Sequence, residues 1–175
     1  MVDKGLESGI RNDTIFLGLY LGMPAKDFYE TCWRLNQEGI LMAGAGNSSV
    51  LYEMKEDFKS EVEINFYPTF YNDVIYEMPV KFKYKAWAPW NKQYSGDSLQ
   101  TEVLRQYNAW YGGGFMEIKH KTKGKAFVKV DGNRRISIYR DGSADGTVWV
   151  LYTDLSVDKD AKVEMEEETA DKNKN

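Results

Sequence analysis

Apolar side chains recur at helical spacing in a first stretch of the chain. Phe28, Cys32 and Leu35 follow one another at intervals of four and three residues, which places them on one face of a helix. Pro24 suits the first helical turn, where its missing N–H costs no hydrogen bond, and Gly39 supplies the stop signal. We therefore predict an amphipathic helix between these two residues.

A second helix is indicated just before the glycine run Gly112–Gly114. Asp97 and Gln100 have the spacing of a capping box, so we expect the helix to begin at Asp97 or Ser98. Its apolar stripe consists of Leu99, Val103, Tyr107 and Trp110. Because the glycines follow the helix rather than precede it, they are interpreted as a C-terminal cap and turn, not as a phosphate-binding loop.

Most of the remaining chain alternates apolar and polar residues, which is typical of half-buried β-strands. One such strand is expected around residues 62–66 and a longer one over 74–84, where Pro79 indicates a bulge or an edge position. The sequence Asp-Gly-Asn at 131–133 predicts a hairpin turn. Residues 147–155 are apolar on both faces, which favours a central strand.

The expected order is therefore helix, strands, helix, strands. The helix starts at Pro24 and Ser98 lie 74 residues apart, and the stops at Gly39 and Gly112 lie 73 apart. This spacing predicts an α+β fold made of two tandem units, each a helix followed by an antiparallel meander, with the helices packed on one face of the sheet. A single α+β domain without duplication is the alternative.

Domain boundaries follow from the same pattern. A flexible N-terminus is expected over residues 1–13, a first unit with an aromatic connecting loop over 14–94, and a second unit over 95–157. Residues 158–175 carry 7 acidic and 4 basic groups and no aromatic residue, so we predict a disordered acidic tail.

Seven residues near the start of the first helix carry a family resemblance: Gly22, Met23, Pro24, Asp27, Phe28, Leu35 and Gly39. They resemble the start of small extracytoplasmic α+β modules, in which Gly-Met-Thr or Gly-Met-Ser precedes a helix with an acidic-apolar pair. The β-lactamase-inhibitor-protein fold and the SmpA-like lipoproteins use such modules, in tandem in the former. The resemblance spans 18 residues and implies a binding role rather than an enzymatic one.

The run Thr14–Ala25 is the longest weakly polar stretch, but it is too short and too rich in glycine to cross a bilayer. Acidic residues precede it, which disfavours a signal peptide, and we expect a buried strand that leads into the first helix. The chain is expected to be soluble, either cytoplasmic or an exported mature chain lacking its signal peptide. A single cysteine fits either compartment.

One cysteine and one histidine leave little room for metal or nucleophilic chemistry. Cys32 lies on an apolar stripe and His120 has no acid partner fixed near it by sequence, so both are interpreted as structural residues. The loop 141–146 has calcium-ligand oxygens at its first, third and fifth positions, but Tyr152 stands where the bidentate glutamate belongs. We expect no metal, no cofactor and no catalytic residue here.

Charge is segregated along the chain, with a balance of −7 over residues 1–80 and +9 over residues 81–140. Three lysines share one face of the long strand: Lys81, Lys83 and Lys85. Four more share one parity farther on: Lys119, Lys121, Lys123 and Lys125. Such ladders favour either a polyanion partner or cross-strand pairing with Glu61 and Glu63.

The chain has a surplus of aromatic residues, with 12 Tyr, 8 Phe and 5 Trp. Six of them occupy two predicted loops, residues 67–73 and 86–94: Tyr67, Phe70, Tyr71, Trp87, Trp90 and Tyr94. Loop aromatics either seal a sheet edge or form a contact surface for a partner.

We therefore expect a non-catalytic protein-binding or assembly module that uses this aromatic surface, with the lysines of the long strand beside it. One alternative is a glycan-active hydrolase with two carboxylates drawn from Asp73, Asp131, Asp141, Asp145 and Asp154. The other is a polyanion-binding protein. A protein partner is favoured over a glycan, and the oligomeric state stays open.

Overall fold

The structure is a computed structural model that describes residues 2–120 and 124–164. The helices are α1 (Val2–Glu7), α2 (Ala25–Gln37) and α3 (Gly96–Tyr111), with short 3-10 turns η1 (Ala45–Asn47) and η2 (Lys92–Tyr94), and residues 158–164 are also helical. The strands are β1 (Leu41–Ala43), β2 (Val50–Met54), β3 (Val62–Phe66), β4 (Thr69–Tyr71), β5 (Val74–Tyr84), β6 (Met116–His120), β7 (Gly124–Asp131), β8 (Arg134–Tyr139) and β9 (Val148–Asp154).

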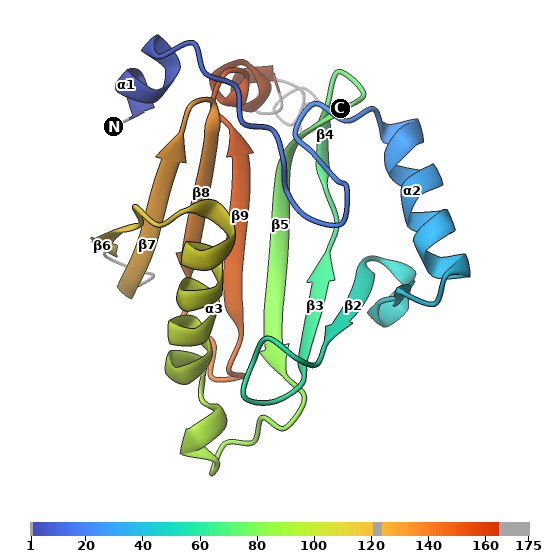
Figure 1. Cartoon of the computed structure of the whole chain (residues 1–175), viewed down its shortest axis with the longest axis vertical. Helices are drawn as coiled ribbons and strands as arrows, with labels where there is room; N and C mark the ends of the chain where they lie inside the picture. Colours follow the sequence, from blue (N-terminus) through green and yellow to red (C-terminus); the bar gives the residue numbers. More distant parts are fainter. Residues whose placement is uncertain (1, 121–123, 165–175) are drawn as a thin grey trace, which may run out of the picture.

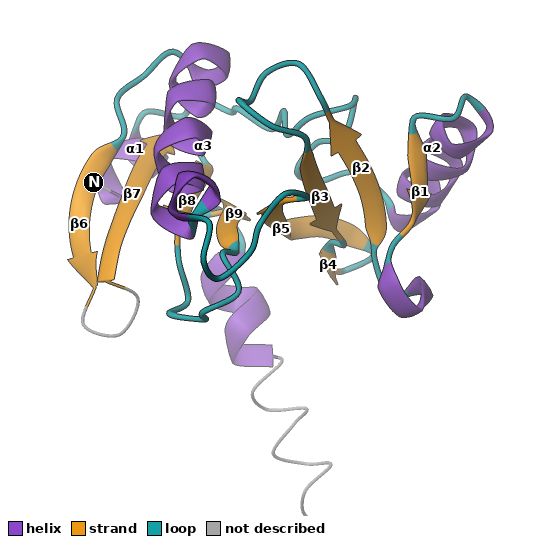
Figure 2. Ribbon diagram, turned by 90° about the horizontal axis from the view of Figure 1, so that it is seen from below, coloured by secondary structure: helices purple, strands orange, loops and turns teal. Residues whose placement is uncertain are grey.

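The strands form one antiparallel sheet in the order β1-β2-β3-β5-β9-β8-β7-β6, with β4 paired to β5 outside this path. The mixed α+β class predicted from the sequence is thereby confirmed. The long strand β5 and the doubly apolar strand β9 are neighbours at the centre, as Figure 1 shows. Seen along the strands, the sheet curves around α3 (Figure 2). The face toward α3 is called the inner face below, and the opposite face the outer face.

Alternation along β5 separates these two faces. Its inner-face residues Met78, Val80 and Phe82 are buried, and Phe82 packs against Tyr107 of α3 with ring centroids 6.1 Å apart. Burying such a continuous apolar surface supplies the main driving force for the fold. Helix α2 lies instead beside β1, at the edge of the sheet (Figure 1).

Both predicted helices are present, and their ends follow the expected chemistry in part. Pro24 precedes α2 directly, and Gly112 ends α3 in the left-handed conformation. The start of α3 differs from the capping box expected at Asp97. Ser95 is the N-cap and accepts a hydrogen bond from the backbone N–H of Ser98, because a serine one turn earlier can satisfy that donor.

Pro79 corrects a second expectation, since it lies in a central strand rather than at an edge. It stands opposite Leu151 of β9, between the part of β5 that pairs with β3 and the part that pairs with β4. The chain at 67–68 turns away from β5 at this level, between β3 and β4. The proline therefore sits where β5 changes partner and no neighbouring strand needs its N–H.

The segment before α2 also differs from expectation. Residues 14–24 form turns and two isolated bridges, Thr14–Tyr20 and Pro24–Val74, instead of a strand. The segment still contributes Ile15, Leu19 and Leu21 to the core. These apolar residues pack on the inner face of the curved sheet, in space that α3 alone does not fill.

Parts of both chain ends are ordered into helix. Residues 2–7 form α1, which contacts β7, where the sequence predicted a flexible N-terminus. Residues 158–164 are helical and bury Ala161, while the rest of the expected acidic tail lies outside the described residues. Across the described residues, every helix is too short or too polar to cross a bilayer.

Candidate functional site

The aromatic residues of the loop after β5 differ in their exposure. Trp90 is 84% exposed, whereas Trp87 and Tyr94 are half-buried. Tyr94 packs edge-on against Tyr84, and Lys83 Nζ lies 4.8 Å from the centroid of the Trp87 ring. Within this loop, Trp90 is thus the residue best placed to meet a partner.

The second aromatic loop lies at the other end of β5. Phe70 and Tyr71 belong to β4, which pairs with the first residues of β5, while Trp87 follows its last residues (Figure 1). A strand of 11 residues separates the two groups, which is roughly 35 Å. The structure therefore does not bring the predicted aromatic residues together into one patch.

Phe70 instead joins a cluster around α2. Its ring lies 6.0 Å from Phe28 and 6.2 Å from Tyr29, and the Tyr29 hydroxyl is hydrogen-bonded to that of Tyr67 at 2.7 Å. Trp33, one turn beyond Tyr29, is 68% exposed. The sequence did not predict this α2 surface, because the stripe of Phe28, Cys32 and Leu35 indicates only the buried face of the helix.

The lysines on the outer face of β5 are largely neutralised. Lys85 lies 2.5 Å from Glu53 and 3.2 Å from Glu61, which confirms the predicted cross-strand pairing for Glu61. Lys83 stands opposite Glu63 in register, and Lys81 lies 4.0 Å from Asp145. Of the second ladder, Lys121 and Lys123 fall outside the described residues.

Lys81 also borders a shallow cavity of about 360 Å³ on the outer face. Trp149 forms part of its wall, with Lys81 Nζ 5.8 Å from the ring centroid. Asn65 of β3 and Ser49, which directly precedes β2, also line it. None of the described residues that line this cavity is a carboxylate. Its chemistry is that of a mixed polar and aromatic groove, not of a hydrolytic site.

Two of the dispersed carboxylates, Asp141 and Asp145, accept hydrogen bonds within their own loop. Asp145 accepts hydrogen bonds from Ser143 Oγ at 2.7 Å and from the backbone N–H of Thr147 at 3.1 Å, and these bonds lower its pKa to about 2. Asp141 accepts from the Trp149 indole N–H at 3.0 Å. A general acid needs a carboxyl group whose pKa is raised, commonly with a second carboxylate beside it. In this loop the pKa values of Asp141 and Asp145 are both lowered.

Two candidates from the sequence remain, Cys32 and His120. Cys32 is half-buried, and burial raises the pKa of its thiol to about 11, which disfavours the reactive thiolate. The side chain of His120 lies outside the described part. Among residues 2–120 and 124–164, no group of three or more His, Cys, Asp or Glu side chains is arranged to hold a metal ion.

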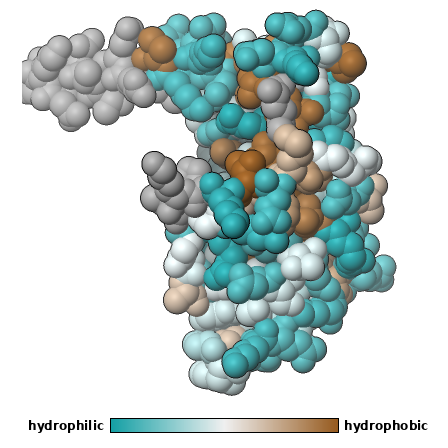
Figure 3. Space-filling view, turned by 90° about the vertical axis from the view of Figure 1, so that its left-hand side faces the viewer, coloured by the Kyte–Doolittle hydropathy of each residue, from teal (hydrophilic) through white to brown (hydrophobic). Residues whose placement is uncertain are grey.

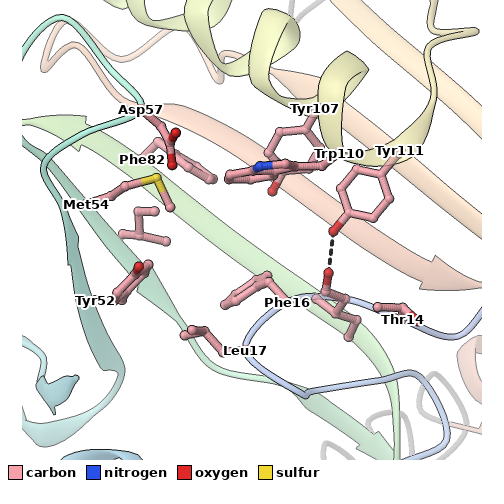
Figure 4. A pocket seen from close by; sticks show the side chains of 12 residues that line it. Thr14, Phe16, Leu17, Tyr52, Met54, Asp57, Phe82, Tyr107, Trp110 and Tyr111 are labelled. Atoms are coloured by element: carbon pink, nitrogen blue, oxygen red, sulfur yellow. Dashed lines mark hydrogen bonds between the residues drawn. The ribbon is translucent and has the colours of Figure 1, made fainter.

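Another cavity lies on the inner face and was not predicted from the sequence. It has a volume of about 390 Å³, inside the range of pockets that bind small molecules. Figure 4 shows its walls, which come from α3, from strands β2, β3 and β5, and from the segment 14–17. Its lining is mainly aromatic and aliphatic: Ile15, Phe16, Leu17, Tyr52, Met54, Ile64, Phe82, Tyr107, Trp110 and Tyr111.

Helix α3 supplies one wall through three aromatic side chains near its C-terminal end. The Tyr107 ring is packed 5.4 Å from Trp110 and 5.3 Å from Tyr111, and Tyr107 itself is fully buried. Trp110 is 41% exposed and stands at the side of the cavity. The indole is therefore available to a bound molecule while its neighbours hold it in place.

Three tyrosine hydroxyls behind this wall form hydrogen bonds with one another. The Tyr152 hydroxyl oxygen lies 2.9 Å from that of Tyr107 and 2.8 Å from that of Tyr111. Tyr111 donates its hydroxyl hydrogen to the backbone carbonyl of Ile15 (Figure 4). Burial raises the pKa of all three tyrosines, so they stay neutral and present mainly ring surface to the cavity.

The segment 14–17 is held over the cavity by a buried cation. Arg134 Nη1 donates to the Thr14 carbonyl at 2.5 Å, and its guanidinium carbon lies 4.8 Å from the Tyr111 ring centroid. Asp131 accepts from Arg134 Nη2 at 3.1 Å. Through Arg134, the β7–β8 hairpin thereby holds the segment 14–17 in place beside Tyr111 of α3.

Among the described residues that line the cavity, Asp57 is the one that carries a charge, and it is exposed. Arg105 donates to its backbone carbonyl at 2.9 Å, and its carboxylate forms no ion pair with any residue of the described part. An unpaired carboxylate beside aromatic rings favours a positive charge on an incoming molecule. The cavity is thus apolar with a negative group at one side.

Comparison of the chain with protein-family models, curated proteins and solved structures gives no match. The function is therefore argued from the geometry and chemistry of the sites themselves. The helical stripe ending in Trp110 was the signal available in the sequence, but it predicts only that this face of α3 turns inward.

Proposed function

We propose that the protein is a non-catalytic binding protein whose inner-face cavity takes up a small apolar ligand. The observation that carries this proposal is a space of about 390 Å³ lined by six aromatic side chains and closed behind by tyrosines whose hydroxyls are already bonded. Such a wall offers ring surface and little unsatisfied polarity, which favours ring stacking and dispersion contacts.

Asp57 supports a narrower choice of ligand, an aromatic or alicyclic amine. A cationic group near its carboxylate gains Coulomb energy, and the same cation gains from the nearby ring faces. An anionic ligand of equal shape meets repulsion from the carboxylate. The proposal therefore predicts an affinity order of cation, then neutral analogue, then anion.

Titration calorimetry with three ligands of nearly equal shape tests this: 1-naphthylmethylamine, 1-naphthalenemethanol and 1-naphthoate. We expect Trp110→Ala to weaken binding of the amine by about tenfold or more, because about 1–2 kcal/mol of ring contact is lost. Trp90→Ala is the matched control, since Trp90 is exposed and lies outside this cavity. Equal binding by all variants, or no binding of any ligand, contradicts the proposal.

Docking of a protein partner is the second candidate function, and exposure of the indoles favours it. None of the five tryptophans is buried, and Trp33 and Trp90 are 68% and 84% exposed. Exposed Trp side chains are frequent hot spots of interfaces. A partner recovered by the wild-type protein and lost from Trp90→Ala or Trp33→Ala, but retained by Trp110→Ala, would support docking outside the cavity.

We also infer that the chain is built from two similar units, as its spacing predicts. The arrangement supports this: α2 precedes β1, β2, β3 and β5, while α3 precedes β6, β7, β8 and β9, and the last strands of both meanders, β5 and β9, pair with each other. Tandem modules of this kind support the proposed resemblance to the β-lactamase-inhibitor-protein fold and the SmpA-like lipoproteins, and with it a binding role.

A further inference from the structure

The sheet ends at β6, whose outer edge meets no other strand of the described residues. β6 pairs with β7 through Met116–His120, while Met116 and Ile118 are 50% and 43% exposed. Figure 3 looks onto this side of the molecule and shows hydrophobic surface among hydrophilic residues. A free strand edge with apolar side chains is a template for pairing with another chain.

Charges along β6 are arranged in an unusual way. Glu117 pairs with Lys125 of β7 at 3.0 Å, while Lys119 stands directly opposite Lys125 in register. Like charges directly opposite each other in a sheet are destabilising. Lys119 forms no ion pair within residues 2–120 and 124–164, so the described part of the chain leaves its charge unpaired.

Sheet geometry limits how two copies of β6 can pair. In a continuous antiparallel sheet, residues that stand opposite each other point to the same face. Glu117 and Lys119 share one face, and Ile118 points to the other. A symmetric β6–β6 pair must therefore be centred on a residue, and the central residue then faces its own copy.

Charge selects among the three central registers. Centring on Glu117 places two carboxylates together, and centring on Lys119 places two ammonium groups together. Centring on Ile118 pairs the two isoleucines and sets each Glu117 opposite the partner copy of Lys119. In this register alone both charged pairs are opposite in sign, and the unpartnered lysine gains a carboxylate.

We propose that β6 is a self-complementary interface through which two copies of this chain join their sheets antiparallel around Ile118. The symmetry axis is perpendicular to the sheet, so both inner-face cavities open on the same side of the dimer. On the outer face, Met116 and Ile118 of both copies form one apolar strip with Val128 and Ala126 of β7.

The opposite edge of the sheet does not offer the same template. β1 has 3 residues, Leu41–Ala43, against 5 in β6, and short edge strands resist pairing. Helix α1 does not block the β6 edge, since Gly5 lies against Val130 and Gly132 at the far end of β7. The structure thus leaves one edge prepared for a second copy.

Sedimentation equilibrium between about 10 μM and about 1 mM, the range of weak associations, measures the dimer. We expect Glu117→Lys alone and Lys119→Glu alone to raise the dissociation constant at least about tenfold, because each places like charges opposite each other. The double reversal Glu117→Lys/Lys119→Glu should restore association, since it recreates both opposite-charge pairs. Circular dichroism establishes that each variant is folded.

A crosslink locates the interface independently of charge. In the background Cys32→Ser, Ile118→Cys places two thiols at the symmetry axis, where opposite Cβ atoms are about 5 Å apart. Rapid oxidation to a disulfide-linked dimer is expected, whereas Met42→Cys in β1 should not crosslink. A monomer at every concentration, or a dimer that ignores all charge reversals and does not crosslink through residue 118, overturns the proposal.

Discussion

The phenol oxygens of Tyr107 and Tyr152 lie 2.9 Å apart in the fully buried space where α3 crosses β9. Tyr111 extends this contact, because its hydroxyl is bonded both to Tyr152 and to the carbonyl of Ile15. Three elements far apart in sequence are thereby joined behind the inner-face cavity. A buried hydroxyl that loses its partner is costly, so this contact gives the cavity wall a fixed shape.

Tyr152→Phe tests that network. Removing the shared hydroxyl leaves the fully buried Tyr107 hydroxyl without its partner, and we expect a loss of about 1–3 kcal/mol in the free energy of unfolding. Urea denaturation followed by circular dichroism measures this loss. Tyr20→Phe, at a tyrosine that is 39% exposed, is the control and should change stability little. Equal effects of the two substitutions would show that the network adds nothing specific.

Arg134→Met tests how the segment 14–17 is held. The substitution keeps much of the aliphatic volume but removes the donors to the Thr14 carbonyl and to Asp131. We expect unfolding to become easier by about 2 kcal/mol or more, with faster amide exchange at 14–17. Arg34→Met is the control, because Arg34 forms a surface pair with Glu38 at 2.8 Å. Unchanged exchange at 14–17 would contradict this role.

Gly146→Ala and Gly142→Ala form a matched pair in the loop between β8 and β9. Both glycines have positive φ, 76° and 85°, so each alanine carries backbone strain of about 1–2 kcal/mol. At Gly146 the new methyl group also meets the Trp87 ring, whereas at Gly142 it meets open space. Gly146→Ala should therefore be the more destabilising in thermal melts and should alter tryptophan fluorescence. Similar melts for both variants would place Trp87 elsewhere.

The raised pKa of the Glu77 carboxyl predicts that the stability of the protein depends on pH. Burial raises the pKa of its carboxyl above the ordinary value, and Asp158 adds to the rise against the opposing charges of Lys162 and Arg135. The folded state then binds the proton more tightly than the unfolded state, so the stabilisation is present at low pH and is lost as pH rises through the raised pKa.

Glu77→Gln should consequently raise the melting temperature at pH 7 by about 1–3 °C and have no such effect near pH 4, where the folded carboxyl is already protonated. Glu30→Gln, at an exposed position on α2, is the control. A melting temperature that falls at neutral pH would mean that the carboxylate is stabilised by its cationic neighbours instead.

Local spacing was enough to predict helices α2 and α3, because each has an apolar stripe and a glycine that marks its end. Pro24 and Gly39 bound α2, and the stripe from Leu99 to Tyr107 faces the core in α3. The hairpin at 131–133 and the central position of β9 were predicted correctly for the same reason. Each of these features depends on residues that are neighbours along the chain.

The candidate sites were harder to predict because they depend on strand pairing. Phe70 and Trp87 looked like members of one surface, yet the full length of β5 separates them. The inner-face cavity needs Tyr52, Trp110 and Phe16, three residues from different parts of the chain. Which strands become neighbours is decided by long-range burial, and no local pattern encodes it.

The sequence by itself determined the alternation of apolar and polar positions, and through it the two helices, the strands and the α+β class, since periodicity follows directly from backbone geometry. Only the tertiary structure decided that β5 and β9 meet at the centre, that Arg134 reaches Thr14, and that the curved sheet leaves a cavity beneath α3. Those outcomes arise because distant segments must share one apolar interior, and the sheet curvature sets where space remains.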